Sequence, residues 1–213
     1  MTDLSIELEQ YILDHIDEEG EVLKDLNRQT HVKMLQPRML SGHLQGQILK
    51  MLCQMIKPTN VLEIGTYTGY SALSMAGGLE KEAHIDTIEI NDELEPFISS
   101  FINKAGCGDK ISLHIGDALE VIPTLDKKYD LVFMDGDKRL YNEYYDLIFD
   151  KLNSGAYILA DNVLWDGKVV EDVNPNDTYT KGILDFNKKI KLDSRVEKVI
   201  LPFRDGIFLI RKK

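Results

Sequence analysis

Five short apolar runs alternate with helical patterns along the middle of this sequence, and each run is followed by glycine or a polar residue. The runs cover residues 61–64, 84–90, 111–115, 129–134 and 156–160. They have the length of β-strands, and a helical connection joins strands that run in the same direction. Repeated strand–helix units form a parallel sheet that helices cover on both faces. The sequence therefore predicts an α/β fold.

The two ends of the sequence follow other patterns. Residues 196–201 and 207–210 are apolar runs joined by a turn at 202–206, so one late strand should be antiparallel. Residues 1–58 should be helical and pack on the core, with apolar faces over 4–16 and 44–56, a stop at Gly20 and a loop at 36–42. After the fourth strand, a helical face should include Tyr141, Tyr144, Tyr145, Ile148 and Leu152. We expect a doubly wound, Rossmann-like, seven-stranded sheet in one domain, residues 1–213.

Composition narrows the class of protein. The 213 residues include 36 acidic and 25 basic side chains, a net charge of −11, and such a surface repels nucleic-acid phosphates and anionic lipid. No apolar run approaches the roughly 20 residues of a membrane helix, and the N-terminus lacks a signal-peptide pattern. Cys53 and Cys107 show no metal-ligand spacing and suit a reducing compartment. We expect a cytoplasmic protein that binds neither nucleic acid nor membrane.

Polar residues and glycine gather where the predicted strands end. Along the chain they are Glu63, Gly65, Glu89, Asp117, Asp135, Asp137, Asp161 and Asn162. In an open α/β sheet, ligands bind at the carboxyl ends of the strands. Asp and Asn also favour turns and helix caps, so one or two such residues would carry little weight. Five strand ends of this kind favour a binding site.

The first strand leads into a glycine loop. Gly65 and Gly69 have the spacing Gly-x-x-x-Gly, which differs from the Gly-x-Gly-x-x-Gly that surrounds a pyrophosphate in dinucleotide folds. Glu89, 24 residues after Gly65, lies where an acidic side chain accepts hydrogen bonds from ribose hydroxyls. Together these residues predict a nucleoside ligand without a pyrophosphate.

A second group contains only oxygen donors. Asp135, Asp161 and Asn162 follow the fourth and fifth strands, and three hard oxygen ligands without His or Cys suit Mg²⁺ or Mn²⁺. The alternative is that Asp135 caps the next helix and that Asp161 and Asn162 form a turn. Lys138 is either a functional amine beside this group or a solvated residue at the start of a helix.

Residues 61–71, 88–90, 116–118, 133–138 and 160–167 resemble, in this order, motifs of the metal-dependent class I S-adenosylmethionine O-methyltransferases. These are the caffeoyl-CoA and catechol O-methyltransferase-like enzymes, and the resemblance runs from about Arg38 to the end of the sequence. It implies methyl transfer from S-adenosylmethionine to a hydroxyl of a small aromatic vicinal diol, assisted by Mg²⁺ or Mn²⁺. It also implies a homodimer.

The resemblance further implies a role for each matching residue. Glu89 would hold the ribose, Asp117 and Ala118 the adenine, and Glu63, Gly65, Tyr67, Ser71 and Asp135 the methionine part, with Met39 closing over the cofactor. Asp135, Asp161 and Asn162 would bind the metal, Lys138 would be the base, and Trp165 with residues 166–180 would border the acceptor. Arg139 and Leu140 stand where the family has acidic or amide residues, which changes the expected contacts to the acceptor.

Other interpretations remain open at the level of sequence. A hydroxylated tRNA base could be the acceptor if Lys188, Lys189 and Lys191 formed a basic patch, although a solvated helix face fits them better. A nicotinamide dehydrogenase would lack the required glycine spacing, and a nucleoside-binding protein without turnover would leave the metal trio unexplained. His43 is expected to be structural, and Cys107 to be a turn residue without a base nearby.

Overall fold

The computed structural model describes residues 5–213, apart from the Ile6 side chain. Within them a seven-stranded sheet has the strand order β3-β2-β1-β4-β5-β7-β6. The strands are β1 (Asn60–Ile64), β2 (His84–Glu89), β3 (Ile111–Ile115), β4 (Tyr129–Met134), β5 (Leu152–Ala160), β6 (Val196–Leu201) and β7 (Ile207–Lys212). The predicted Rossmann-like sheet is confirmed.

The described chain divides into two compact units. The C-terminal unit comprises residues 60–65 and 116–213, and the N-terminal unit comprises residues 5–59 and 66–115. The assignment of residues 1–213 to a single domain, with helices 1–58 packed on its core, stays a prediction. Residues 1–4, including the Leu4 of the predicted first helix, lie outside the described part.

In the C-terminal unit, β1, β4 and β5 run parallel and in register at their ends. Ile64 pairs with Met134, and Met134 pairs with Ala160. Strand β7 is antiparallel to both β5 and β6, which confirms the C-terminal hairpin. Helices α6 (Ala118–Thr124), α7 (Tyr141–Phe149) and α8 (Thr178–Leu192) complete this unit with the short helices η3 (Lys138–Leu140) and η4 (Trp165–Val170). The carboxyl ends of three strands therefore meet at one edge.

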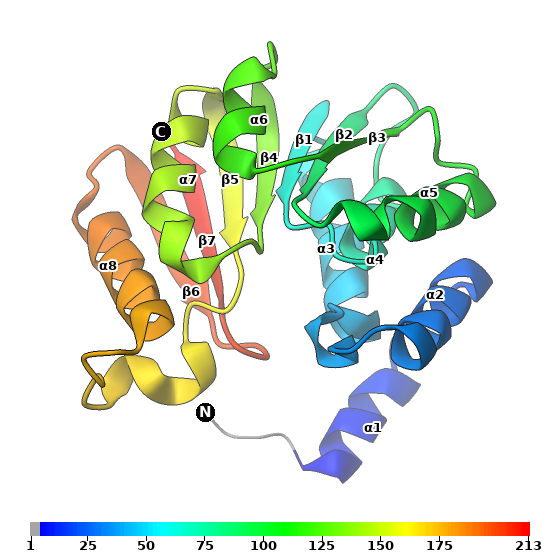
Figure 1. Ribbon diagram of the computed structural model, residues 1–213, viewed down its shortest axis with the longest axis horizontal. Coiled ribbons are helices and arrows are strands. Elements are labelled where there is room, and N and C mark those ends of the chain that lie inside the picture. Colours follow the sequence, from blue (N-terminus) through cyan, green and yellow to red (C-terminus); the bar gives the residue numbers. More distant parts are fainter. Residues whose placement is uncertain (1–4) are drawn as a thin grey trace. The chain divides into compact units, whose positions relative to one another are not determined.

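Helices α7 and α8 pack against each other in this unit (Figure 1). Their contact is aromatic: the rings of Tyr141 and Tyr145 meet the Phe186 ring edge-on, with centroids 5.3 and 6.2 Å away. All three side chains are fully buried. Burial of each such ring contributes about 1.5–3 kcal/mol, so this cluster fixes the first turn of α7 against α8.

The N-terminal unit holds β2 and β3, which are parallel, with Glu89 opposite Ile115. Its helices are α1 (Ile6–Asp14), α2 (Glu21–Lys33), α3 (Gly42–Ile56), α4 (Tyr70–Ala76) and α5 (Glu95–Lys104), with the short helices η1 (Pro37–Met39) and η2 (Asp92–Leu94). Helix α4 packs against α2 and α3, and all seven of its residues are buried. The predicted loop at 36–42 contains η1 and the first residue of α3.

Two predicted helix ends are wrong. Gly20 does not end the first helix; α1 already ends at Asp14, where His15 bonds back to Ile12, and Gly20 is instead the N-cap of α2. Leu152 does not belong to the helical face that begins at Tyr141. Helix α7 ends at Phe149, and Leu152 starts β5 opposite Tyr129. An apolar residue fits either element, and here pairing with the neighbouring strand decides.

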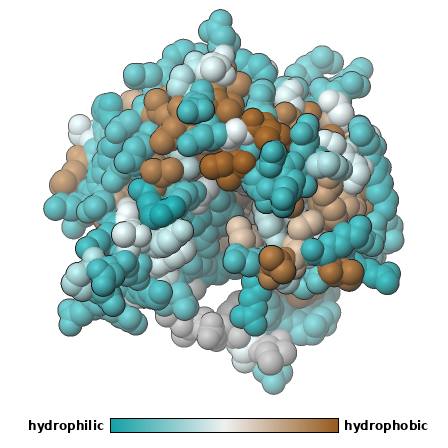
Figure 2. Space-filling model, in the orientation of Figure 1, coloured by the Kyte–Doolittle hydropathy of each residue, from teal (hydrophilic) through white to brown (hydrophobic). Residues whose placement is uncertain are grey.

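None of the helices in residues 5–213 combines the length and the apolar content that crossing a bilayer requires. The face of the molecule drawn in Figure 2 is largely hydrophilic, and its apolar side chains form separate groups among polar ones.

Candidate functional site

The ends of β1, β4 and β5 bring the first predicted site residues together. Asp135 directly follows β4, and its backbone N–H donates to the Ile64 carbonyl at 2.9 Å. Asp161 directly follows β5, and its N–H donates to the Met134 carbonyl at 3.0 Å. These two bonds continue the parallel ladder by one residue on each strand, so both carboxylates stand at the same sheet edge.

Gly65 lies against Asp135 at this edge. A Cβ on Gly65 would be 2.5 Å from the Asp135 carbonyl oxygen, and its φ of 97° lies in the left-handed region. Only glycine fits both conditions without strain. The sequence indicated that Gly65 would let a ligand approach the backbone; in the structure it also lets the ends of β1 and β4 approach each other.

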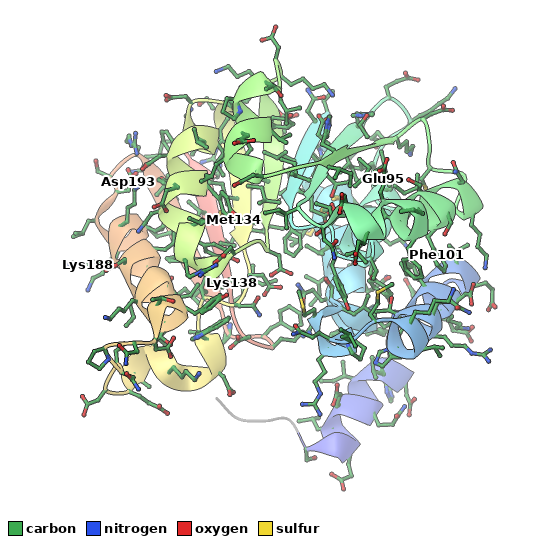
Figure 3. The ribbon with its side chains drawn as sticks, viewed as in Figure 1. Glu95, Phe101, Met134, Lys138, Lys188 and Asp193 are labelled. Carbon is green, nitrogen blue, oxygen red and sulfur yellow. The ribbon has the colours of Figure 1, made fainter. Side chains whose placement is uncertain are left out.

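Lys138 turns back toward Asp135 from η3, one short turn beyond β4. Its Nζ lies 2.5 Å from Asp135 Oδ1 and 2.8 Å from Tyr141 Oη. Lys138 is 7% exposed, although lysine is seldom buried without a partner. Figure 3 labels Lys138 together with Met134 at the end of β4. The structure therefore excludes the solvated-surface interpretation of Lys138.

The charged groups at this edge shift the pKa of Asp135. Desolvation raises the pKa of the Asp135 carboxyl to about 6, and the neighbouring Asp161 adds to that rise, although the Lys138 ammonium opposes it. Arg204, in the β6–β7 turn, also acts on Asp135 and lowers its pKa. Burial raises the pKa of Tyr141 well above its usual value, so this phenol stays protonated.

The third predicted metal ligand lies in a strained turn. Asn162 has a φ of 59°, a conformation that asparagine tolerates better than most residues, and its N–H donates to Asp161 Oδ1 at 2.7 Å. Its side-chain amide donates to Asp205 Oδ2 at 3.4 Å. Asp205 Oδ1 accepts the N–H of Asp166 at 2.5 Å, and burial raises the pKa of Asp205.

The donor set at this edge fits a hard divalent cation. The nearby Asp161 carboxylate raises the pKa of Asp135, and a cation between two carboxylates relieves such repulsion. Asn162 adds an amide oxygen from the adjoining turn. Within residues 5–213 no cluster of three His, Cys, Asp or Glu side chains could hold a metal ion, and this group has two carboxylates and one amide. Any cation here would depend on ligands outside the protein for its remaining positions.

The N-terminal unit holds the predicted ribose ligand. Glu89 ends β2, is 7% exposed, and accepts the N–H of Tyr67 at 2.7 Å and that of Asn91 at 2.9 Å. These bonds fix both oxygens, while burial raises the pKa of the carboxyl. Ile90 beside it is 72% exposed, an apolar surface next to an oriented carboxylate.

The other residues predicted for the cofactor occupy varied places. In the N-terminal unit, Ser71 is buried in the first turn of α4, and Met39 is 55% exposed in η1. In the C-terminal unit, Glu63 is fully buried in β1, Asp117 caps α6 through Leu119 N at 2.9 Å, and Ala118 is buried behind it. Asp117 thus has the capping role that the alternative interpretation gave to such residues.

An aromatic and cationic surface follows the Asp161–Asn162 turn. The Trp165 and Tyr179 rings stack with centroids 6.0 Å apart, and the Arg139 guanidinium lies 4.8 Å from the centre of the Tyr179 ring. Arg139 also bonds to Asp137 through its Nε, at 2.9 Å from Oδ1. Among the described residues, the buried Trp165 Nε1 donor has no hydrogen-bond partner. The departure from the family pattern at Arg139 therefore lies against the segment expected to border the acceptor.

Two residues at this site were missing from the sequence-based set. Tyr141 bonds to Lys138, and Asp205 bonds to the turn at Asn162. Tyr141 looks like one of several tyrosines on a helical face, and Asp205 like a hairpin residue. Their spacing gave no signal, because their roles arise from contacts between distant elements.

The structure also places the residues on which the alternative interpretations depend. Lys189 bonds to Asp146 at 2.7 Å, while Lys188 and Lys191 are exposed on α8. His43 Nε2 lies 2.8 Å from the Asp17 carbonyl, and Cys107 lies in the turn between α5 and β3.

Comparison with known proteins adds independent findings. The O-methyltransferase family model matches residues 14–213. Caffeoyl-CoA O-methyltransferase 5 of Nicotiana tabacum is 37% identical over 221 residues, which cover 96% of this chain and 90% of that protein. Caffeoyl-CoA O-methyltransferase of Petroselinum crispum is also 37% identical, over 218 residues with the same two coverages.

Solved structures show the same fold. An O-methyltransferase from Bacillus cereus in complex with SAH has a TM-score of 0.90, 27% sequence identity and 96% coverage of both chains. The O-methyltransferase TomG from Streptomyces achromogenes, in complex with SAM, has a TM-score of 0.91 and 27% identity, covering 97% of this chain and 96% of its own.

Proposed function

Because this chain belongs to the O-methyltransferase family and is of the caffeoyl-CoA type, we propose that it methylates a hydroxyl of a small aromatic vicinal diol with the help of Mg²⁺. The methyl donor of this S-adenosylmethionine-dependent class would be S-adenosylmethionine. The observation that carries the proposal is the buried Lys138 amine held beside Asp135, at the edge where Asp161 and Asn162 also stand.

The residues that would hold the cofactor support this proposal. Glu89, oriented by backbone amides at the end of β2, would accept hydrogen bonds from ribose hydroxyls, and the exposed Ile90 offers an apolar surface to a base. The proposal also gives cofactor contacts to Met39, Glu63, Gly65, Tyr67, Ser71, Asp117, Ala118 and Asp135. SAH and SAM are bound in the Bacillus cereus and Streptomyces achromogenes relatives.

Asp135, Asp161 and Asn162 would hold the divalent cation. A phenol has a pKa of about 10, so its ionisation at pH 7 costs roughly 4 kcal/mol. The cation, when bound, lowers the pKa of hydroxyls that it contacts, and this is the chemistry it supplies. The acceptor would provide two neighbouring oxygens to the ligand positions that the protein leaves open.

Lys138 would remove the proton. Its Nζ would accept the hydroxyl proton, and the acceptor oxygen would then attack the methyl carbon. A new C–O bond forms as the C–S bond breaks, and the electron pair of that bond stays on sulfur. The protein's remaining task is alignment, which for such a displacement is worth several kcal/mol.

The surface formed by Arg139, Trp165 and Tyr179 would receive the acceptor ring. Two stacked aromatic rings favour a flat aromatic partner, and the Trp165 Nε1 donor would bond to a polar group of the acceptor. Arg139 stands over one of these rings and adds a positive charge beside the acceptor.

The test is methyl transfer from labelled S-adenosylmethionine to a panel of aromatic vicinal diols, with Mg²⁺ or with excess chelator. We expect transfer that requires the metal. Asp135→Ala should lower the rate by about 100-fold or more, because stabilisation of charge by a bound cation is worth several kcal/mol.

Asp126→Asn is the matched control, since it removes an exposed carboxylate of the same unit and should leave the rate unchanged. Full activity in chelator would contradict the metal assignment. Methylation of bulk tRNA in place of the diols would overturn the acceptor class, and cofactor binding without turnover on any diol would leave a nucleoside-binding protein.

A further inference from the structure

The hydroxyl of Tyr141 joins three parts of the C-terminal unit. Tyr141 Oη lies 2.8 Å from Lys138 Nζ, 3.0 Å from the Met134 carbonyl oxygen and 3.0 Å from the Asp161 carbonyl oxygen. Met134 ends β4 and Asp161 follows β5, so the phenol ties Lys138 to the same edge that carries the carboxylates.

The direction of these hydrogen bonds follows from the groups involved. A phenol has one proton and two lone pairs, whereas a carbonyl oxygen can only accept. The Tyr141 proton must therefore go to Met134 or to Asp161. The bond to Lys138 then runs the other way, and Nζ donates an N–H to Tyr141 Oη.

The same reasoning applies to the Lys138 amine. Lysine Nζ has three tetrahedral positions besides its bond to carbon. Asp135 Oδ1, at 2.5 Å, and Tyr141 Oη both accept from Nζ, so together they occupy two of these three positions. We propose that Tyr141 is a positioning residue that, with Asp135, fixes the Lys138 amine so that its lone pair is left for the acceptor hydroxyl.

This inference rests on the proposed function, in which Lys138 is the base. Without the Tyr141 hydroxyl, Nζ rotates about its last C–C and C–N bonds, and the lone pair has no fixed direction. A misplaced catalytic group lowers the rate of proton transfer without weakening the binding of the acceptor.

The ring of Tyr141 is held independently of its hydroxyl. It is fully buried and meets Phe186 edge-on at 5.3 Å. Tyr141→Phe therefore removes one oxygen and keeps this packing. Tyr145→Phe is the matched control, since it removes a hydroxyl from a fully buried ring on the same helix, where the bond goes to Asp193 Oδ2 at 2.9 Å.

The first measurement is steady-state methyl transfer with Mg²⁺. We expect Tyr141→Phe to lower kcat by about 10- to 100-fold with KM nearly unchanged, and Tyr145→Phe to keep the wild-type kcat. Equal kcat in wild type and Tyr141→Phe would overturn the inference. So would equal losses in both variants, because these would report lost stability.

The acidity of the acceptor separates positioning from a structural role. A nitrocatechol, whose acidic hydroxyl ionises without help, does not need a well-placed base. The defect of Tyr141→Phe should therefore shrink severalfold on nitrocatechol compared with catechol. A defect of the same size on both acceptors would show that Tyr141 supports the fold and does not orient the base.

A third readout needs neither cofactor nor turnover. In an ¹⁵N-edited spectrum of the lysine side chains, the Lys138 Nζ of the free protein should exchange its protons slowly, since both of its partners are buried or half-buried. Tyr141→Phe should accelerate this exchange by about tenfold or more, and Tyr145→Phe should not. Unchanged exchange would overturn the inference even in an active enzyme, whereas wild-type protein inactive on every diol would refute the proposed function alone.

Discussion

Single side chains in this protein connect elements by filling several hydrogen-bonding positions at once. Asp193, at the end of α8, accepts from Tyr145 on α7 and from the backbone and guanidinium of Arg195. These bonds, chiefly that from the Arg195 side chain, hold the pKa of Asp193 well below its usual value. A depressed pKa means that the folded state favours the carboxylate, so this group links stability to pH.

Asp193→Asn should lower the free energy of unfolding by about 1–3 kcal/mol at pH 7. The pKa of Asp193 is depressed in the folded state. Its contribution is therefore complete above the unfolded value of about 3.9 and disappears as the pH falls toward the folded one. Urea unfolding of wild type and variant at several pH values checks this. A difference in unfolding free energy between wild type and Asp193→Asn that stays constant down to pH 2 would contradict this prediction. Asp126→Asn serves as the control.

For single residues, the sequence predicted which polar side chains gather at the strand ends better than it predicted which side chains bond to one another. Asp135, Asp161 and Asn162 could be grouped because they follow neighbouring strands, and the register of β4 with β5 confirms that placement for the two carboxylates. Tyr141 and Asp205 could not be found, since a hydroxyl or carboxylate that bonds across elements leaves no mark in local periodicity.

The contact between α8 and η3 sets how closely Lys138 is held. Gly182 on α8 faces the η3 backbone, where a Cβ would be 2.5 Å from the Lys138 carbonyl oxygen and 2.8 Å from the Arg139 Cα. Both neighbours are backbone atoms, so they cannot turn aside as a side chain can. Residue 182 must be glycine for the helix to approach η3 this closely.

Gly182→Ala should therefore push η3 away and lower stability by about 1–3 kcal/mol, together with kcat, because the Lys138 amine moves. Thermal unfolding and steady-state kinetics measure the two effects. Gly108→Ala is the control, since the nearest atom to its Cβ would be 3.8 Å away. Wild-type stability and kcat in Gly182→Ala would show that the η3 backbone moves aside without loss of stability or activity, and would contradict this prediction.

At the level of elements, apolar periodicity predicted strands better than helix ends. Residues 111–115, 129–134 and 196–201 have the predicted bounds. The errors at Gly20 and Leu152 have a physical cause. A helix ends where its last carbonyls find other donors, as at His15, and a short apolar segment takes whichever partner tertiary packing offers.

For the molecule as a whole, the proposed cation would stabilise the fold by binding to the native state alone. Mn²⁺ at about 100 times its dissociation constant should add about 2.7 kcal/mol to the free energy of unfolding of the wild type. Asp161→Asn should abolish this gain. Unfolding of both proteins with and without Mn²⁺ measures this gain in stability. An equal gain in the variant would show that the cation binds elsewhere.

Sequence patterns could not determine the oligomeric state or the identity of the acceptor. The homodimer stays a prediction, although Leu8 and Tyr11 of α1 are 46% and 60% exposed and offer apolar surface. An acceptor is recognised by the shape of a surface such as that of Arg139, Trp165 and Tyr179. That surface is built from residues of η3, η4 and the start of α8, which composition does not encode.

The β6–β7 turn has a consequence for the order of events during synthesis. Asp205 braces the Asn162 turn from more than 40 positions downstream, and β7 gives β5 its second neighbour. A nascent chain that has left the ribosome only as far as β6 would contain Asp135, Lys138 and Asp161, but would lack the hydrogen bond between Asn162 and Asp205. The proposed cation site should thus form late, so an incomplete nascent chain would bind the ion only weakly.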